Sequence, residues 1–262
     1  MAKYLTVYRL GLSRALVYRT NLLLGAVNIV IWFGTFILLY KSIGGSLGSY
    51  SVPELVTYVL GTSFLSAMLF NSAIMDKIAD EIVEGDLVNY LLQPVNYFYY
   101  WLARSAAMRT PLVVISLIVV FILSRFVSSD LIVQSDPTIL WQTVTLTIGS
   151  IIMMTCFDFL AGMFSFWTDR GFGARWLLMI SARFLSGAAL PIALMPLWAQ
   201  TFFKATPFPY LIAAPVETYL GHTDATTFVQ TMIVQWAWIA VTIIAVALVW
   251  RRGIKRYAAY GT

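Results

Sequence analysis

The chain has 262 residues, of which 60% are hydrophobic and 11% are charged, and its mean hydropathy is +0.81. These values exclude an ordinary soluble domain and indicate a protein that crosses a membrane several times. The net charge of +5 is therefore interpreted as a signal of membrane topology and of attraction to membrane lipid, and no nucleic-acid partner is expected.

Six apolar stretches are long enough to cross a bilayer, because a helix of about 20 residues spans its hydrocarbon core. The predicted spans are residues 20–40, 55–75, 104–124, 139–166, 174–198 and 228–250. We therefore predict an all-α integral membrane protein in which residues 1–262 form a single transmembrane domain.

The basic residues indicate the orientation of the spans, because positive charge near the ends of a span resists translocation. If the N-terminus is cytoplasmic, 13 of the 17 Lys and Arg residues lie on the cytoplasmic side, 3 lie outside, and Arg183 lies within a span. The cytoplasmic set is Lys3, Arg9, Arg14, Arg19, Lys77, Arg104, Arg109, Arg170, Arg175, Arg251, Arg252, Lys255 and Arg256. We therefore predict that both termini are cytoplasmic.

Residues 1–19 precede the first span and have the pattern of an amphipathic helix. Leu5, Tyr8 and Leu12 recur at helical spacing, and basic side chains such as Arg9 can reach lipid head groups. We predict an interfacial helix here. An ordinary basic flank of the first span is the alternative.

The cytoplasmic loop at residues 76–94 carries the most functional information. Ile78 and Ile82 lie on one helical face, acidic residues line another, and Gly85 is placed to end the helix. Because the loop is acidic on a side where basic residues prevail, we predict that it docks onto a basic groove of a soluble partner. A solvated helix is the alternative. The residues assigned to docking are Asp80, Glu81, Glu84, Gly85, Leu87, Leu91 and Leu92.

Asp158 and Arg183 are the ionisable side chains placed well inside the predicted spans. They stand equally far before and after the turn that joins the fourth and fifth spans, so straight helices would hold them at similar depth. A lone charge there costs at least ~2.5–3.5 kcal/mol, which a partner relieves. We predict a buried ion pair between them. The alternative is that Arg183 snorkels or lines a water-filled pathway.

The segment from Pro191 to Pro215 is rich in proline yet apolar. Because proline cannot continue a regular helix, Pro191 and Pro196 are predicted to break the fifth span. Residues 197–215, which contain Pro207 and Pro209, are too apolar for a solvated loop. We predict an external re-entrant segment that caps a pathway, with an irregular extracellular cap as the alternative.

Five motifs follow one another in a recognisable order. They are Tyr18-Arg19-Thr20-Asn21; Glu81 with Glu84-Gly85-Asp86-Leu87 and Leu91-Leu92-x-Pro94; Ser186-Gly187 with Pro191 and Pro196-Leu197-Trp198; Pro207-Phe208 with Pro215 and Tyr219-Leu220-Gly221; and Arg252-Gly253-Ile254-Lys255-Arg256-Tyr257. Together they resemble a six-span branch of the permease subunits of ABC-2 type transporters, over essentially the whole chain. Gly253 departs from the alanine that the branch usually has.

The resemblance implies a fold like that of the ABC-2, or type V, exporters, in a bacterial or archaeal cytoplasmic (inner) membrane. Two permeases, identical or sister chains, would join two cytosolic ATPase subunits that hold ATP and magnesium. Residues 76–94 would form the coupling helix that carries the motion of the ATPases to the spans. The implied substrates are lipids, drugs, peptides or glycans, moved outward.

The residues themselves predict no catalytic, cofactor or metal site in this chain. No G-x-x-x-x-G-K-[ST] phosphate-binding motif occurs, so an ATPase would have to be another chain. The single cysteine, Cys156, and the single histidine, His222, cannot build a Cys- or His-based metal site or a catalytic triad, and His222 is expected to face solvent. The alternative function is an ion-coupled secondary carrier or channel, in which Asp158 would be the intramembrane acid.

Overall fold

The computed structural model describes residues 2–17, 19–43, 46–70, 74–126, 131–168 and 172–260. Apart from one isolated bridge between Leu47 and Tyr50, the regular structure in these ranges is helical. The helices are α1 (Ala2–Val17), α2 (Arg19–Ile43), α3 (Val52–Phe70), α4 (Ile74–Val83), α5 (Leu87–Leu91), α6 (Tyr97–Phe126), α7 (Pro137–Met163), η2 (Phe164–Phe166), α8 (Phe172–Leu185), η3 (Ile192–Leu194), α9 (Leu197–Lys204), η4 (Phe208–Leu211), α10 (Ala213–Tyr219) and α11 (Ala225–Tyr260).

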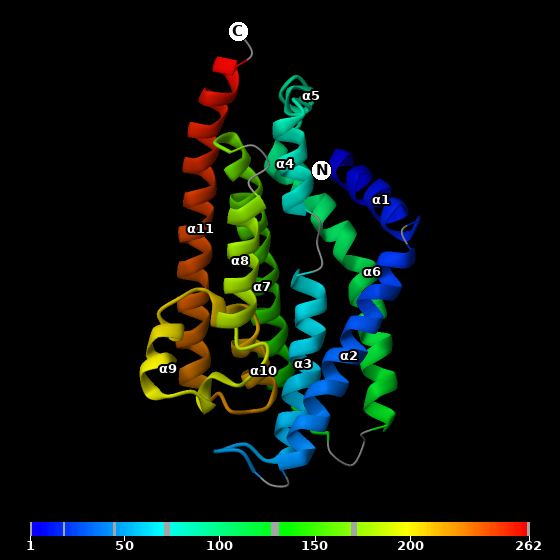
Figure 1. Ribbon diagram of the computed structural model, residues 1–262, viewed down its shortest axis with the longest axis vertical. Helices are drawn as coiled ribbons and strands as arrows, with labels where there is room; N and C mark the ends of the chain where they lie inside the picture. The colour runs from blue at the N-terminus through cyan, green and yellow to red at the C-terminus, as the bar shows by residue number, and fades with distance from the viewer. Residues whose placement is uncertain are drawn as a thin grey trace.

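The long helices lie roughly along one axis, and α1, α4, α5 and both chain ends gather at one end of the molecule (Figure 1). Within the described residues, four stretches are long and apolar enough to cross a membrane: Val52–Val83, Tyr97–Phe126, Pro137–Phe166 and Ala225–Tyr257. Two shorter apolar stretches lie within α2 and α8. The all-helical membrane architecture is confirmed, and the count of six spans stays a prediction.

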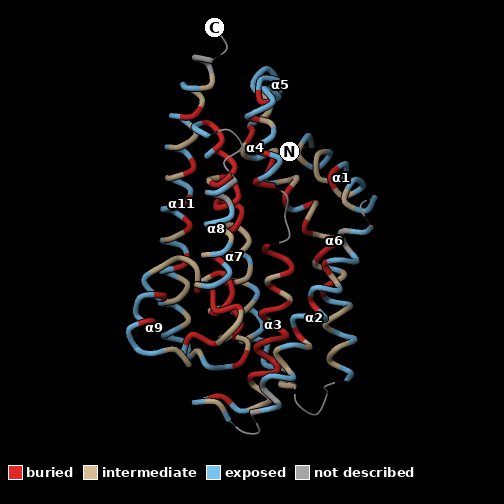
Figure 2. Tube along the Cα trace, in the orientation of Figure 1, coloured by how far each residue is buried: buried red, intermediate tan, exposed pale blue. Residues whose placement is uncertain are grey.

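The core lies along α3 and α7, where buried residues gather (Figure 2). Tyr58 and Leu69 of α3 and Met153 of α7 are almost completely inaccessible. The outer helices instead expose large apolar side chains, such as Leu24 of α2 and Phe121 of α6. A water-soluble protein would cover its core with polar residues and would not expose so many large apolar side chains. A bundle whose outer surface faces lipid tails would have this distribution.

The fifth apolar helix, α8, ends at Leu185, so the expectation that it continues to residue 198 is wrong. The helix stops because Gly187 has a φ of +77°, a left-handed conformation that glycine adopts without a steric penalty. The break therefore precedes Pro191 and Pro196, which stand instead immediately before η3 and α9.

The chain between α8 and α11 folds into short helices that pack back on the bundle. Pro207 directly precedes η4 and Pro209 lies inside it, and η4 and α10 contact α7. Leu197 and Trp198 of α9 are 80% and 73% exposed, so this helix keeps an apolar outer surface. In Figure 1, α9 lies alongside the lower half of the long helices, at the end of the molecule remote from α4.

Candidate functional site

The helices α4 and α5 form a two-sided element at the end of the molecule that also carries the termini. Ile78 and Ile82 are buried, which confirms the apolar face predicted for this loop. Leu87 is also completely buried in the same cluster, so it holds α5 in place and is not an exposed anchor as we expected. Leu91 and Leu92 are 49% and 80% exposed and remain available on the surface.

The acidic residues of this element divide into two groups. Asp80 and Glu84 are exposed, whereas Glu81 is half-buried and points toward the protein. Its carboxylate accepts hydrogen bonds from the Tyr90 hydroxyl at 2.8 Å, the Tyr97 hydroxyl at 2.8 Å and the Trp101 indole N–H at 3.1 Å. A carboxylate with three donors is well satisfied.

The Glu81 cluster, as we call Glu81, Tyr90, Tyr97 and Trp101, joins three helices. Glu81 belongs to α4, Tyr90 to α5, and the other two residues to the first turns of α6. Glu81 is therefore a positioning residue that orients α4, and its placement departs from the docking role assigned to it from the sequence.

Two glycines allow α4 to sit where it does. Gly85 has a φ of +86° just after the end of α4, which confirms that it terminates this helix, and its carbonyl accepts a hydrogen bond from the Tyr257 hydroxyl of α11 at 2.8 Å. Gly162 of α7 faces Ile78, and a Cβ added to Gly162 would lie only 2.8 Å from the Ile78 Cβ. The two helices can approach this closely only because Gly162 has no side chain.

A buried ion pair joins α6 to α7. The Arg109 Nη2 lies 2.7 Å from the Asp158 Oδ2, and the two side chains are only 3% and 1% exposed. The Arg109 Nη1 donates to the Thr155 hydroxyl at 3.1 Å. Pro111 follows Arg109 by two residues inside α6. The pair places both charges where lipid cannot reach them, which removes most of the cost of isolated ions.

The predicted partner of Asp158 was wrong: Arg109 occupies that place, and Arg183 does not. Arg183 lies in α8 with its guanidinium over the Phe70 ring of α3, 5.3 Å from the ring centroid. Equal distance from a turn gives similar depth but does not determine the direction of a side chain around its helix. Arg109 was counted with the basic residues of the cytoplasmic side and not among the charges inside the spans, but α6 begins at Tyr97, so Arg109 lies twelve residues into this helix.

The signal for Arg109 was present in the residues that precede it. The run Tyr97-Phe98-Tyr99-Tyr100-Trp101 forms the first turns of α6. If these aromatic residues are counted as helix, Arg109 lies about 18 Å from the start of the helix at 1.5 Å per residue, well inside the span. The Glu81 cluster had no comparable signal, because periodicity does not show which hydroxyl groups approach a carboxylate.

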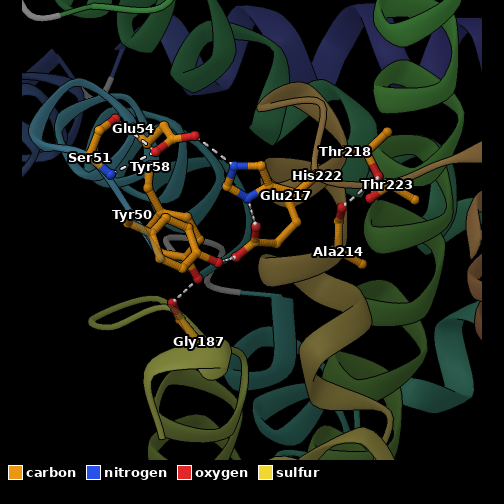
Figure 3. A network of polar contacts seen from close by, with 10 residues as sticks. All are labelled: Tyr50, Ser51, Glu54, Tyr58, Gly187, Ala214, Glu217, Thr218, His222 and Thr223. Atoms are coloured by element: carbon orange, nitrogen blue, oxygen red, sulfur yellow. Dashed lines mark hydrogen bonds and ion pairs between the residues drawn. The ribbon is translucent and has the colours of Figure 1, made fainter. Parts of the chain in front are cut away.

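At the opposite end of the molecule, His222 connects two carboxylates (Figure 3). Its Nε2 lies 2.9 Å from Glu54 Oε1 at the start of α3, and its Nδ1 lies 2.8 Å from Glu217 Oε2 in α10. Glu217 also accepts a hydrogen bond from the Tyr50 hydroxyl at 2.6 Å, and Glu54 accepts from the backbone N–H and hydroxyl of Ser51. His222 was expected to face solvent. Its side chain is partly exposed, but both ring nitrogens contact carboxylates.

This His222 network favours a charged imidazole. A neutral ring carries a single N–H, so it could donate to only one of the two carboxylates, whereas the imidazolium donates to both. Burial lowers the pKa of His222, but the hydrogen bonds and negative charges of Glu54 and Glu217 outweigh it and raise the pKa above its ordinary value.

Among the described residues, no group of three or more His, Cys, Asp or Glu side chains is arranged to hold a metal ion. Cys156 is a buried thiol in α7. The polar clusters described above join helices to one another.

One comparison with known proteins found a match. A family model described as "ABC-2 family transporter protein" matches residues 26–261. No curated protein and no solved structure matches the chain.

The buried pair predicts a specific double-mutant cycle. Replacing Asp158 with Ala leaves the Arg109 charge without its carboxylate, and we expect a loss of about 3–5 kcal/mol in the free energy of unfolding in detergent. Adding Arg109→Met should recover much of this loss. Arg183→Met is the matched control, and its effect should add to that of Asp158→Ala within about 0.5 kcal/mol. Stronger coupling of Asp158 to Arg183 than to Arg109 would contradict the pairing.

The His222 network predicts a dependence on pH. The raised pKa means that its stabilisation is complete below the ordinary value of 6.5 and is lost as pH rises through the pKa of the folded protein. Because His222 is the single histidine, NMR of histidine-labelled protein reports its titration directly. Glu54→Gln and Glu217→Gln should each lower this pKa, whereas Asp224→Asn in the same loop should leave it nearly unchanged. A pKa at or below the ordinary value would refute the network.

Proposed function

Because the chain belongs to the ABC-2 transporter family, we propose that it is the membrane-spanning permease subunit of an ATP-driven exporter for a hydrophobic or amphipathic substrate. In this proposal it works with a second permease, of the same or a sister chain, and with cytosolic ATPase subunits that bind ATP and magnesium. The substrate would be a lipid, drug, peptide or glycan that moves outward across a bacterial or archaeal inner membrane.

The observation that carries this proposal is the two-sided construction of α4 and α5. One side is fixed to the rest of the protein by Ile78, Leu87 and the Glu81 cluster. The other side presents Asp80, Glu84 and the exposed Leu91 and Leu92. Exposed apolar residues beside acidic ones are the features of a surface that binds a partner with a basic rim and an apolar pocket.

The contacts of α4 give a physical route for coupling. An ATPase that moves α4 acts on α7 through the close contact of Ile78 with Gly162, and on α6 through the Glu81 cluster. It acts on α11 through the hydrogen bond of Tyr257 to Gly85. Packed helices transmit such displacements as rigid units because protein interiors have few voids.

The proposed topology has six crossings by α2, α3, α6, α7, α8 and α11, with α1 lying in the cytoplasmic interface. The basic residues support the cytoplasmic position of the end that carries the termini. α8 has only 14 residues, or about 21 Å of helix, which is less than the hydrocarbon thickness of ~30 Å. The short helices after Gly187 would complete this crossing.

The segment around α9 and η4 is proposed to cap the external end of the pathway, with Pro191 and Pro196 setting its direction. A pocket of about 760 Å³ lies between this segment and the His222 network. Its walls include Tyr50, Lys204 and Glu217. The mixture of charges would suit the passage of a polar group at this end of the molecule.

An ion-coupled carrier is less well supported. Such carriers use an intramembrane acid whose charge changes during transport. The Asp158 carboxylate is instead held at 2.7 Å by the Arg109 guanidinium, which favours a structural contact between α6 and α7.

The docking role predicts that reversing the exposed charges releases the ATPase. Asp80→Lys with Glu84→Lys should weaken binding of the copurifying ATPase roughly tenfold or more, at about 1 kcal/mol for each partly exposed contact, while membrane insertion stays normal. The matched control reverses two exposed acids at the opposite end, Asp136 and Asp224. If the ATPase copurifies equally with both variants, this surface does not bind it.

The coupling route predicts a separate defect for Gly162→Ala. The added methyl group would collide with Ile78, and overpacking of this kind costs about 1–3 kcal/mol. We expect normal ATPase copurification but a reduced stimulation of ATP hydrolysis by the permease. Gly34→Ala is the control, because a Cβ there has no neighbour within 4 Å. Full stimulation by the Gly162 variant would remove this contact from the route.

A further inference from the structure

A second pocket, of about 340 Å³, lies between α2, α3 and α8. Its size is within the range of about 300–1,000 Å³ that is usual for ligand sites. Polar side chains from all three helices line it, namely Asn28, Ser63, Ser66 and Arg183. Trp32 and Phe184 complete the walls with apolar surface and are 37% and 66% exposed. The pocket is therefore mostly apolar and carries a small set of polar side chains, next to the apolar surface that faces lipid.

Arg183 is the charged residue of this pocket, and among the described residues no acid pairs with it. Its side chain makes no hydrogen bond or ion pair with any residue that the structure describes, and its guanidinium lies over the face of the Phe70 ring. A cation over an aromatic face leaves the N–H groups at the edge of the guanidinium unsatisfied. Arg183 lies about 17 Å along α8 from its first residue, near the middle of a hydrocarbon layer ~30 Å thick.

Two buried hydroxyl groups that line this pocket also lack hydrogen-bond partners. Ser63 and Ser66 lie three residues apart on α3 and so share one face of the helix. Both Oγ atoms are inaccessible to solvent and have no hydrogen-bond partner. Ser63 as a whole is only 3% exposed, so water does not replace the missing partner. A serine inside a helix can usually satisfy its hydroxyl on the carbonyl four residues earlier, as Thr57 does on Pro53. Unsatisfied donors beside an unpaired guanidinium point to a missing acceptor.

We infer that this pocket binds the anionic head group of an amphiphile, a phosphate or a carboxylate, at mid-depth in the membrane. Arg183 supplies the charge and a planar pair of N–H donors that suits such oxygens, and the serine hydroxyls supply neutral donors. Among the described residues that line the pocket, none is acidic, so none of them would repel the anion. The exposed apolar surface of Phe184 and Trp32 receives the hydrocarbon part.

The depth of the site connects it to transport. Bilayer phospholipids keep their head groups at the interface, so a head group held beside Arg183 belongs to a molecule on its way across. The inference that the occupant is cargo rests on the permease function proposed above, whereas binding itself does not require an ATPase. The substrate class is then an anionic amphiphile.

The test measures binding of phosphatidylglycerol to the purified full-length permease by native mass spectrometry, without the ATPase. It also measures the melting temperature in nanodiscs of phosphatidylcholine with or without phosphatidylglycerol. We expect Arg183→Gln to weaken phosphatidylglycerol binding tenfold or more, and Arg183→Lys to retain part of it. Ser63→Ala with Ser66→Ala should also weaken binding while leaving the melting temperature in phosphatidylcholine unchanged or higher.

Two matched controls separate this site from general effects. Thr62→Ala removes a neighbouring buried hydroxyl of α3 that already bonds to the Val59 carbonyl, and Arg125→Gln removes an exposed basic residue elsewhere. Neither should change phosphatidylglycerol binding. Equal losses in Arg125→Gln and Arg183→Gln would overturn the proposal, because the attraction would then be a property of any basic residue.

Further outcomes identify the occupant. Inorganic phosphate alone should neither bind nor displace phosphatidylglycerol; if it does both, an amphiphile is not required and the proposal fails. If Arg183→Gln lowers the dimer fraction and leaves lipid binding intact, a second copy covers the pocket, which also overturns it. ATPase copurification with Arg183→Gln should stay normal, so a negative lipid result leaves the permease function standing. Loss of ATPase copurification in the unaltered protein would reject that function instead.

Discussion

A polar group in a lipid-facing bundle has to find its partner within the protein, because hydrocarbon offers none. The contact of Arg109 with Asp158 is the place where this constraint is strongest, since both partners carry a full charge. It joins α6 to α7, and α1 packs on α6, while α4 and α11 pack on α7. The pair is therefore one of the contacts that link α1 and α6 to α4, α7 and α11, together with the Glu81 cluster.

Carboxylates near the two ends of the molecule also find their partners within the protein. The Glu81 carboxylate is satisfied by donors from α5 and α6, and the Glu54 and Glu217 carboxylates are joined by His222. The Glu81 cluster joins three consecutive helices, whereas His222 joins α3 to α10, and each cluster fixes a contact that apolar packing alone would allow to slide. Arg183 is the exception among these charges, because the structure describes no acid beside it.

The sequence predicted what depends on periodicity and composition. It located the long apolar helices, the buried face of Ile78 and Ile82, and the helix end at Gly85, because each follows from a local pattern. It did not predict that Glu81 points inward or that Arg109 pairs with Asp158, because spacing along a helix gives depth and face but not the neighbouring helix. Gly187 terminates α8 before Pro191 and Pro196, the residues predicted to break it, because a residue in the left-handed conformation ends a helix without any proline.

Pro111 gives α6 a mechanical property of its own. Proline has no backbone N–H, so the helix lacks a hydrogen bond at this point and bends there with less loss than elsewhere. The residues before Pro111 hold the Glu81 cluster, whereas Leu117 and Val120 after it line a separate apolar pocket of about 630 Å³. Arg109, two residues before Pro111, is held to α7 by Asp158, so a change in the direction of α6 at Pro111 would move its second half relative to α7. Pro111 would then act as a hinge in α6, with the contact of Arg109 and Asp158 as the fixed point beside it.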